Sequence, residues 1–497
     1  MFLAAVVLAG LLGGCGKPEK PGETTAAPGT TTRRASVSKD LKLPCAKNDT
    51  LNPYKAASAL NRQIAMLLYD GLFHIDAAFK PVPVAAKGYN LGNLSITVQI
   101  KPGLKFTDGT ALTSEDVVAS FNKAKSSPAY AARLANLKSA AASGNDGVVF
   151  TLHKKDPYAV NCLDFAITPS DDKNAVPAGS GRYILEEENG IKILTPNGNR
   201  LGRYVSKINK ILLVEAADSK TLSHLLQIGG ISFLFSDLRD GSYSRISASA
   251  MDVPMNSMVF LAFNSKKPAL KDPAVRRAAG KAIDRESVAA MAFQGHARAA
   301  YSPFNPDWMA EKQTKTVPDA KQAASILEKA GYTAKDAEGT RRMPRGPKLE
   351  LSLLVNKGNG FKTQAARSIA AQLKEAGIKV NVRQLSEEDF NKEVKAGKFD
   401  MYLGQTVFSP NMNLSPILAP GGAVSYGIDT ANSPAGKAYA DFIEGRIDLT
   451  GFIKAFNDDS PFLSLCYLNG VAAFDRSLTV TKSAFSDVYC DIGNWYF

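Results

Sequence analysis

Residues 349–405 read LELSLLVNKGNGFKTQAARSIAAQLKEAGIKVNVRQLSEEDFNKEVKAGKFDMYLGQ. Their hydrophobic pattern switches between period two and period 3.6, which predicts alternating strands and helices. The expected strands are Leu349–Val355, Ile378–Gln384 and Asp400–Gly404, and the expected helices are Lys362–Ala376 and Glu387–Ala396. Gly377 provides the helix stop that such a connection needs. This alternation predicts βαβ units in a mainly parallel sheet, and therefore an α/β fold.

The end of this stretch also predicts where a ligand would bind. Ligands of parallel sheets bind beyond the carboxyl ends of the strands. The last expected strand ends at Gly404, and the residues that follow it read QTVFSPNMN to position 413. We therefore expect the segment after Gly404 to line a cleft.

An earlier stretch, residues 89–153, predicts a small α+β unit. Ile96, Val98 and Ile100 alternate with polar residues, as in a half-buried strand. Thr113 and Asp116 have the spacing of a capping box at the start of a helix. Further short strands are expected at Lys105–Thr107 and Val148–Leu152, and a mostly helical segment at Ala269–Gln294.

Composition and length limit the classes of protein to which the chain can belong. The chain has 497 residues, 45% of them hydrophobic and 22% charged, which is close to the average of soluble globular proteins. This composition excludes a disordered or collagen-like chain, and the length suggests two to four domains. The net charge of +13 comes without a dense basic run or an aromatic-rich basic motif, so we expect a solvated basic surface and no nucleic-acid partner.

The first residues predict export and a lipid anchor. The apolar run Phe2–Gly13 is shorter than the about 20 residues that a membrane-spanning helix needs and fits a secretory leader. Leu12-Gly13-Gly14-Cys15 resembles the bacterial lipobox. We expect a signal peptide over residues 1–15, lipidation at Cys15, and a flexible tether over residues 16–36, whose composition offers little to bury.

Motifs of catalysis are missing from the sequence. It contains no His-Glu-x-x-His, no P-loop and no Gly-x-Ser-x-Gly. We therefore expect no catalytic residue, no metal site and no cofactor. The remaining cysteines, Cys45, Cys162, Cys466 and Cys490, form no Cys-x-x-Cys pair, and either disulfides or buried free thiols fit them.

Several motifs in order resemble one family. They are Leu51-Asn52-Pro53-Tyr54, Leu68–Phe73, Lys105–Val117, Gly179-Ser180-Gly181-Arg182-Tyr183 and Asp272–Arg285. Together they resemble the extracellular solute-binding proteins of family 5, the oligopeptide-, dipeptide- and nickel-binding components of ABC importers. The fourth motif is similar to the family's Gly-Thr-Gly-Pro-Tyr, with Arg182 where the family has proline. Taken singly, most of these residues also fit a purely structural role.

The resemblance implies a two-lobed, periplasmic-binding-protein-like (Venus-flytrap) α/β fold with an extra small α+β domain, three domains in total. Lobe I would combine residues 37–57, 172–260 and 462–497, with the small domain inserted at 58–171. Lobe II would be residues 261–461. The lobes would close on a ligand that contacts both of them only in the closed state.

The resemblance also implies which residues face the ligand. Peptide-binding members hold the ligand's amino group with a carboxylate shortly after the last strand of the far lobe. No Asp or Glu lies between Asp400 and Asp429, and no His follows His296. Recognition would then rest on neutral side chains and one apolar wall, namely Gln405, Thr406, Asn411 and Asn413 with Phe408. This set favours a peptide held mainly through its backbone, or another polar solute; an ordinary surface loop is the alternative.

The sequence thus predicts a lipid-anchored, extracytoplasmic, monomeric receptor that passes a small solute, of peptide class, to a permease and an ATPase outside this chain. Two alternatives stay open at this point. One is a surface sensory or adhesive receptor on the same fold that does not transport, and the other is an extracellular hydrolase.

Overall fold

The structure is a computed structural model that describes residues 39–200, 204–216, 220–308 and 312–497. The expected signal peptide, residues 1–15 with Cys15, and the expected tether, residues 16–36, lie outside the described residues. Within the described part of the chain, no helix combines the length and the apolar character that crossing a membrane requires.

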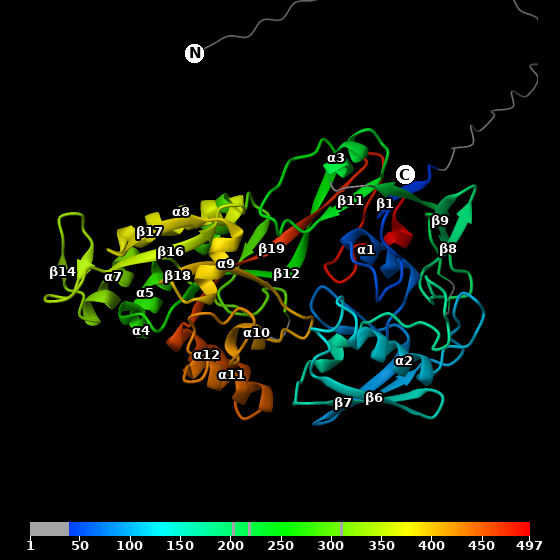
Figure 1. The fold of residues 1–497 in the computed structure, drawn as a ribbon, viewed down its shortest axis with the longest axis horizontal. Helices are drawn as coiled ribbons and strands as arrows, with labels where there is room; N and C mark the ends of the chain where they lie inside the picture. The colour runs from blue at the N-terminus through cyan, green and yellow to red at the C-terminus, as the bar shows by residue number, and fades with distance from the viewer. Residues whose placement is uncertain (1–38, 201–203, 217–219, 309–311) are drawn as a thin grey trace, which may run out of the picture. The chain divides into compact units, whose positions relative to one another are not determined.

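The largest sheet is mixed and has strand order β11-β19-β12-β18-β16-β17, with β13 beside β19 (Figure 1). Its strands are β11 (Phe233–Ser236), β12 (Ser249–Phe263), β13 (Ala297–Ala299), β16 (Glu350–Asn356), β17 (Lys379–Leu385), β18 (Met401–Val407) and β19 (Phe462–Phe474). The pairs of β16 with β17 and with β18 are parallel. The pairs of β12 with β18 and with β19, and of β11 with β19, are antiparallel.

The βαβ units predicted from residues 349–405 are confirmed. Strands β16, β17 and β18 alternate with α8 (Gly360–Glu375) and α9 (Glu387–Lys395), and Gly377 has the positive φ of 89° expected after a helix. The expected mainly parallel sheet is correct only for this half. It is wrong for the other half, because β12 and β19 cross the sheet as long antiparallel strands.

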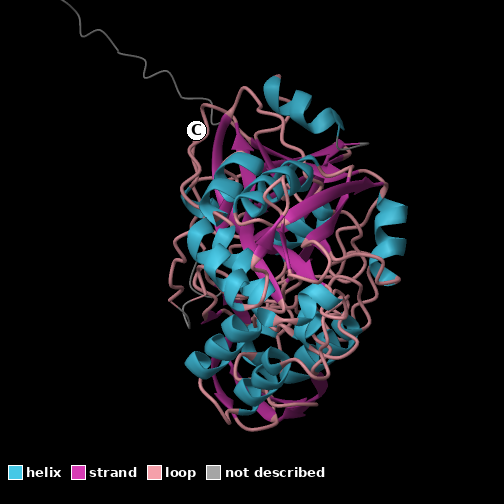
Figure 2. Cartoon of the chain, turned by 90° about the vertical axis from the view of Figure 1, so that its left-hand side faces the viewer, coloured by secondary structure: helices cyan, strands magenta, loops and turns pink. Residues whose placement is uncertain are grey.

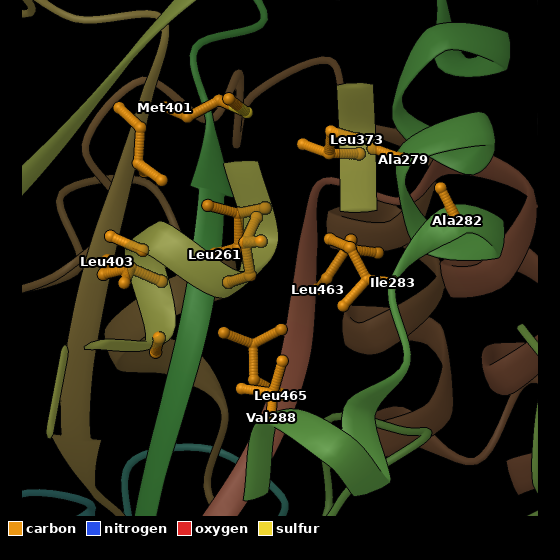
Figure 3. Close-up of a cluster of buried hydrophobic side chains, with 14 of the residues drawn as sticks. Leu261, Ala279, Ala282, Ile283, Val288, Leu373, Met401, Leu403, Leu463 and Leu465 are labelled. Carbon is orange, nitrogen blue, oxygen red and sulfur yellow. The ribbon is translucent and has the colours of Figure 1, made fainter. Parts of the chain in front are cut away.

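Each face of this sheet is covered by its own set of helices. Leu261 and Phe263 of β12 pack toward α5, α7 and α8, whereas Phe260 and Ala262 pack toward α9 and the α10–α12 group. The covering helices are α4 (Pro268–Lys271), α5 (Pro273–Ala282), α6 (Arg285–Ser287), α7 (Ala320–Lys329), α10 (Ser415–Leu418), α11 (Pro434–Glu444) and α12 (Leu449–Asp459), with a π-helical turn at Val288–Ala292. The core on the side of α5, α7 and α8 is the first core of the large sheet, and the core on the side of α9–α12 is the second. Figure 3 shows the first core, where Leu261, Leu403 and Leu463 from adjacent strands meet. Figure 2 shows helices flanking the strands.

The small α+β unit predicted near residue 100 is present. Its antiparallel sheet has the order β4-β5-β7-β6, formed by β4 (Ala86–Leu91), β5 (Ser95–Ile100), β6 (Leu137–Ser143) and β7 (Gly147–Leu152), and α2 (Ser114–Lys125) packs on it. The Asp116 carboxylate accepts the Thr113 backbone N–H at 2.8 Å, as the capping pattern predicts. The expected strand at Lys105–Thr107 is wrong: Lys105 forms a single bridge with Ala111 across a tight turn.

A further sheet has the order β1-β10-β9-β8, and the end of the chain closes its core. The Trp495 ring lies 5.0 Å from the Phe233 ring and is fully buried. The remaining elements are β1 (Leu41–Ala46), β8 (Tyr183–Glu188), β9 (Ile191–Pro196), β10 (Ile211–Ala216), α1 (Ala59–Leu68), α3 (Lys220–Gln227), the hairpins β2 (Phe73–Ile75) with β3 (Pro81–Pro83) and β14 (Ala334–Lys335) with β15 (Arg341–Arg342), and the 3₁₀ turns Ala159–Cys162 and Ile492–Asn494.

Candidate ligand-binding site

The segment expected to line a cleft begins inside β18 and continues as a loop to Asn413. Gln405 and Thr406 are half-buried residues of β18 that pair with Val259 and Met258 of β12. The Gln405 amide donates to the Ser257 hydroxyl at 3.0 Å. The two residues therefore sit at the carboxyl end of the parallel half of the sheet, where sequence reasoning expected a ligand.

Asn256 fixes the course of the loop. Its backbone carbonyl accepts the Phe408 N–H at 3.0 Å, and its side-chain amide donates to the Phe408 carbonyl at 3.0 Å. Asn305 in turn donates to the Asn256 side-chain oxygen at 3.1 Å. A short chain of amides thus holds the backbone around Phe408, whose ring is only 3% exposed and packs in the second core of the large sheet.

The loop also contacts the small α+β unit. The Asn411 amide donates to the Asp156 carboxylate at 2.7 Å. Asn161 donates to the Pro410 carbonyl at 3.1 Å and to the Phe79 carbonyl at 2.8 Å. Segments far apart in the sequence therefore meet here through side-chain amides, which can rearrange their hydrogen bonds to accommodate a polar ligand.

Asp156 is the carboxylate that sequence reasoning did not find near this loop. Burial raises the pKa of its side chain, although bonds from the Tyr158 backbone and from Asn411 act in the opposite direction. Among the described residues, no ion pair of a lysine or arginine with Asp156 is formed. A half-buried carboxylate without a cation is electrostatically suited to an ammonium group from outside the chain. No sequence signal marks it, because 255 residues separate it from Asn411.

The side-chain oxygens of Asn411 and Asn413 differ in whether they already have a hydrogen-bond partner. Asn411 is 6% exposed, and its side-chain oxygen is buried without a hydrogen-bond partner. The Asn413 side-chain oxygen, by contrast, accepts from the Ser415 N–H at 3.0 Å and from the Tyr439 hydroxyl at 3.2 Å. Asn411 therefore has an unsatisfied acceptor, which a ligand reaches only if the loop shifts, whereas Asn413 mainly shapes the start of α10.

An aromatic group borders the polar residues. The Phe304 and Trp308 rings stack with centroids 4.2 Å apart, and the Tyr158 ring meets the Trp308 ring edge-on at 5.0 Å. Sequence reasoning looked for tryptophan only after β18 and so missed Trp308, which comes from the loop after β13. The aromatic contact between Tyr158 and Trp308 joins the same two parts of the molecule as the Asn411–Asp156 bond.

The cysteines resolve the alternative that the sequence left open. Cys45, Cys162, Cys466 and Cys490 are all free thiols. Burial raises the pKa of Cys45 and of Cys490 to about 11, and raises the pKa of the other two thiols as well. The three buried thiols, Cys45, Cys162 and Cys466, are therefore inert structural residues rather than nucleophiles, whereas Cys490 is only half-buried and accessible to a reagent.

Comparison with known proteins gives a consistent family likeness. Residues 80–423 match the profile of the bacterial extracellular solute-binding proteins, family 5 Middle. The glutathione-binding protein GsiB of Escherichia coli (strain K12) is 24% identical over 488 residues, which cover 90% of this chain and 92% of that protein. The oligopeptide-binding protein AppA of Bacillus subtilis (strain 168) is 29% identical over 323 residues, which cover 59% and 58% of the two chains.

Solved structures show the same fold. The crystal structure of a nickel ABC transporter protein from Bacillus halodurans is 18% identical and superposes with a TM-score of 0.76. The superposition covers 93% of this chain and 100% of that one. The expected two-lobed α/β architecture is therefore confirmed at the level of the whole described chain.

Proposed function

Because the chain belongs to the bacterial extracellular solute-binding proteins of family 5, which serve ABC importers, we propose that it binds a short peptide outside the cytoplasm and passes it on unchanged. The observation that carries the peptide class is the loop after β18, with its side-chain amides and the half-buried Asp156 carboxylate beside Asn411. The relatives named above are a glutathione-binding and an oligopeptide-binding protein, and glutathione is itself a small peptide with a free amino group.

The proposed binding mode uses both kinds of group. Asp156 receives the peptide's ammonium and takes the place of the carboxylate that is missing after β18. Gln405, Thr406 and Asn411 supply neutral hydrogen bonds to the peptide backbone. Phe408, which packs in the core, and Asn413, which bonds to Ser415 and Tyr439, hold the loop in shape. A buried ammonium needs such a partner, since an isolated buried charge costs several kcal/mol.

The proposed mechanism is closure of two lobes. Lobe I comprises residues 37–57, 172–260 and 462–497 with the inserted domain at 58–171, and lobe II comprises residues 261–461. Strand β12 runs across the boundary between residues 260 and 261, and strand β19 begins directly after the boundary between residues 461 and 462, which supports their role at the two connections about which the lobes move. A ligand that contacts both lobes shifts the population toward the closed state by its differential affinity.

The proposed partners lie outside this chain. They are a permease and an ATPase that act on the closed, loaded form. Attachment to the membrane through a lipid on Cys15 and action as a monomer complete the proposal. Mass spectrometry of the mature protein tests the anchor: a diacylglyceryl group on Cys15 supports it, and an unmodified Cys15 in membrane-free protein contradicts it.

The function is tested by ligand screening on the full-length protein. Thermal unfolding and calorimetry are run with defined di- to pentapeptide pools, with glutathione, and with nickel–histidine as a separate arm. A rise in Tm with peptides supports the proposal. A rise with nickel–histidine alone, or with none of these ligands, contradicts the peptide class.

A further inference from the structure

A cavity of about 490 Å³ lies within the part of the chain that combines the β1-β10-β9-β8 sheet, the small α+β unit and the C-terminal residues. Its walls come from α1, β2, the segment around Tyr130 and the turn around Cys490. This volume is within the range of about 300–1,000 Å³ typical of small-molecule sites. None of the residues from Gln405 to Asn413 lines it, so it is distinct from the loop after β18.

Charged pairs line this cavity. Arg133 pairs with Asp164 at 3.0 Å, Arg182 with Asp487 at 2.5 Å, and Arg200 with Asp70 at 3.0 Å. A fourth guanidinium, that of Arg62, donates to the backbone carbonyl of Ala57 at 2.5 Å. The wall therefore carries one more arginine than aspartate, and the excess favours a ligand with an anionic group.

One of these pairs is incompletely satisfied. Arg133 Nε and Asp164 Oδ1 are both buried without a hydrogen-bond partner, although their other atoms bond to each other. The Tyr204 hydroxyl, also on the cavity wall, is buried without a partner too. Buried polar groups are rarely left unpaired. A donor and an acceptor on the same ion pair thus lack partners. Both atoms have almost no accessible surface, so a ligand reaches them only when the Arg133 and Asp164 side chains, 23% and 15% exposed, turn toward the cavity. A ligand that offers both an acceptor and a donor would then satisfy them together.

Arg182 builds part of the wall. Its guanidinium donates to the Tyr489 carbonyl at 2.6 Å, to the Met66 carbonyl at 3.0 Å and to Asp487. These bonds hold the C-terminal turn against α1 and so close one side of the cavity.

We propose that this cavity is a second ligand site and that it takes a small zwitterion of the amino-acid class. The ligand's carboxylate accepts from Arg133 Nε and faces Arg62, and its ammonium donates to Asp164 Oδ1. Its side chain packs among the apolar wall residues, such as Phe73 and Val84. A simple anion would leave Asp164 Oδ1 unpaired, and a simple cation would face the excess of arginine. This inference does not depend on the peptide proposal for the loop after β18.

The test uses Cys490, a half-buried thiol on the cavity wall, as a local reporter. The full-length protein is incubated with single L-amino acids, with acetate or with methylamine. Labelling of Cys490 by iodoacetamide is then followed by peptide mass spectrometry, and affinity is measured by calorimetry. We expect at least one amino acid to slow the labelling of Cys490, and acetate and methylamine to have no effect.

Two conservative variants test the assignment of the groups. Arg133→Lys keeps a cation beside Asp164 but removes the Nε donor, and Asp164→Asn keeps the shape but removes the charge. Each should weaken amino-acid binding by about tenfold or more, the usual effect of losing one hydrogen bond to a charged group. The matched control is Arg383→Lys, in a surface pair with Glu393 at 2.8 Å, which should change nothing.

The outcomes separate this site from the other one. Asp156→Asn, a change near the loop after β18, should leave the amino-acid effect on Cys490 intact; its loss would place the ligand at that loop and overturn the proposal. Equal protection by acetate, or no protection by any amino acid, also overturns it. If Asp164→Asn fails to fold, Arg133→Lys alone decides.

Discussion

At the scale of single residues, the structure corrects where a functional group can come from. The sequence after β18 has no acidic residue before Asp429, which argued against recognition of an amino group by a carboxylate at that place. Folding brings Asp156 to Asn411 from a distant segment and buries it enough to raise its pKa. Spacing along the chain predicted the loop itself, since the loop follows a strand, but no local pattern could predict a partner that only the tertiary fold supplies.

Replacing Asp156 by asparagine should weaken peptide binding and raise the free energy of unfolding. The variant should lose about tenfold to a hundredfold in affinity for a peptide with a free amino group, the usual cost of losing one charge-assisted bond. It should also be more stable at neutral pH by about 1 kcal/mol, because a half-buried charge without a cation partner is removed. Calorimetry and urea unfolding measure the two effects. An N-acetylated peptide serves as the control ligand and should bind both proteins equally weakly.

The pH dependence of this variant has a definite sign. The folded-state pKa of Asp156 is raised above its unfolded value, so the wild-type protein loses stability as pH rises through the folded pKa. The asparagine variant lacks this loss, so its advantage should shrink on acidification. An advantage that grows toward low pH would contradict the assignment.

A buried arginine in a motif that resembles the family's should prove structural. Arg276 and Asp459 pair at 2.8 Å with side chains 4% and 6% exposed, and Arg276 also donates to the carbonyls of Leu270 and Ser460. Arg276→Met should cost about 3–5 kcal/mol of unfolding free energy, because it leaves a buried carboxylate unpaired. The neighbouring Arg277→Gln is the matched control and should stay within about 0.5 kcal/mol of wild type. Similar losses in both variants would refute a specific role of the buried pair.

For the helices and strands, the period of the hydrophobic pattern predicted where they lie in the sequence but not which strands pair in the sheet. Strands β16, β17 and β18 were predicted because helices connect them in sequence, and connected strands of this kind pair in parallel. The pairing of β12 with β19 is invisible to such reasoning, since about 200 residues separate the two strands. The expected strand at Lys105–Thr107 failed for a local reason: Gly103 and Gly109 both have positive φ and bend the chain on either side of it.

The first turn of α8 contains a lysine at a position that disfavours positive charge. Lys362 lies beside the Asn359 cap, where the helix dipole disfavours positive charge, and burial lowers its pKa to about 8. In the unfolded chain a lysine titrates near about 10.4. Between these values the unfolded state binds more protons, so the Lys362 contribution makes stability rise with pH through that window and is lost as pH falls through the folded pKa.

Lys362→Met should therefore raise the free energy of unfolding at pH 7 by about 1 kcal/mol. It should also flatten the rise between pH 8 and about 10.4. Urea unfolding at several pH values measures both effects. The exposed Lys357→Met serves as the control and should show neither; a Lys362→Met protein whose pH profile parallels wild type would disprove the shift.

In the described chain as a whole, the two long strands β12 and β19 connect the parts of the molecule that form the candidate site. β12 and β19 pair with each other along most of their length. β12 also carries Asn256, which holds the loop after β18, and Asn469 of β19 bonds to Asp252 of β12 at 3.1 Å. A rotation about these strands would change the approach of Asp156 to Asn411, and it would also separate Ile75 and Phe79 of the inserted domain from the lobe II residues with which they share a core.

Peptide binding should therefore be visible as a change of size without a change of secondary structure. Saturating peptide should lower the radius of gyration measured by small-angle scattering, while the circular dichroism spectrum stays constant. Asp156→Asn at the same peptide concentration should stay near the unliganded value, since the ligand then lacks the contact that distinguishes the closed state. A single-amino-acid ligand of the second cavity should leave the radius unchanged, because that cavity lies within residues 53–204 and 486–490 and spans neither of the two connections. If calorimetry detects peptide binding but the radius of gyration does not change, the peptide is bound without closure of the lobes. The two strands would then be rigid connections rather than a hinge.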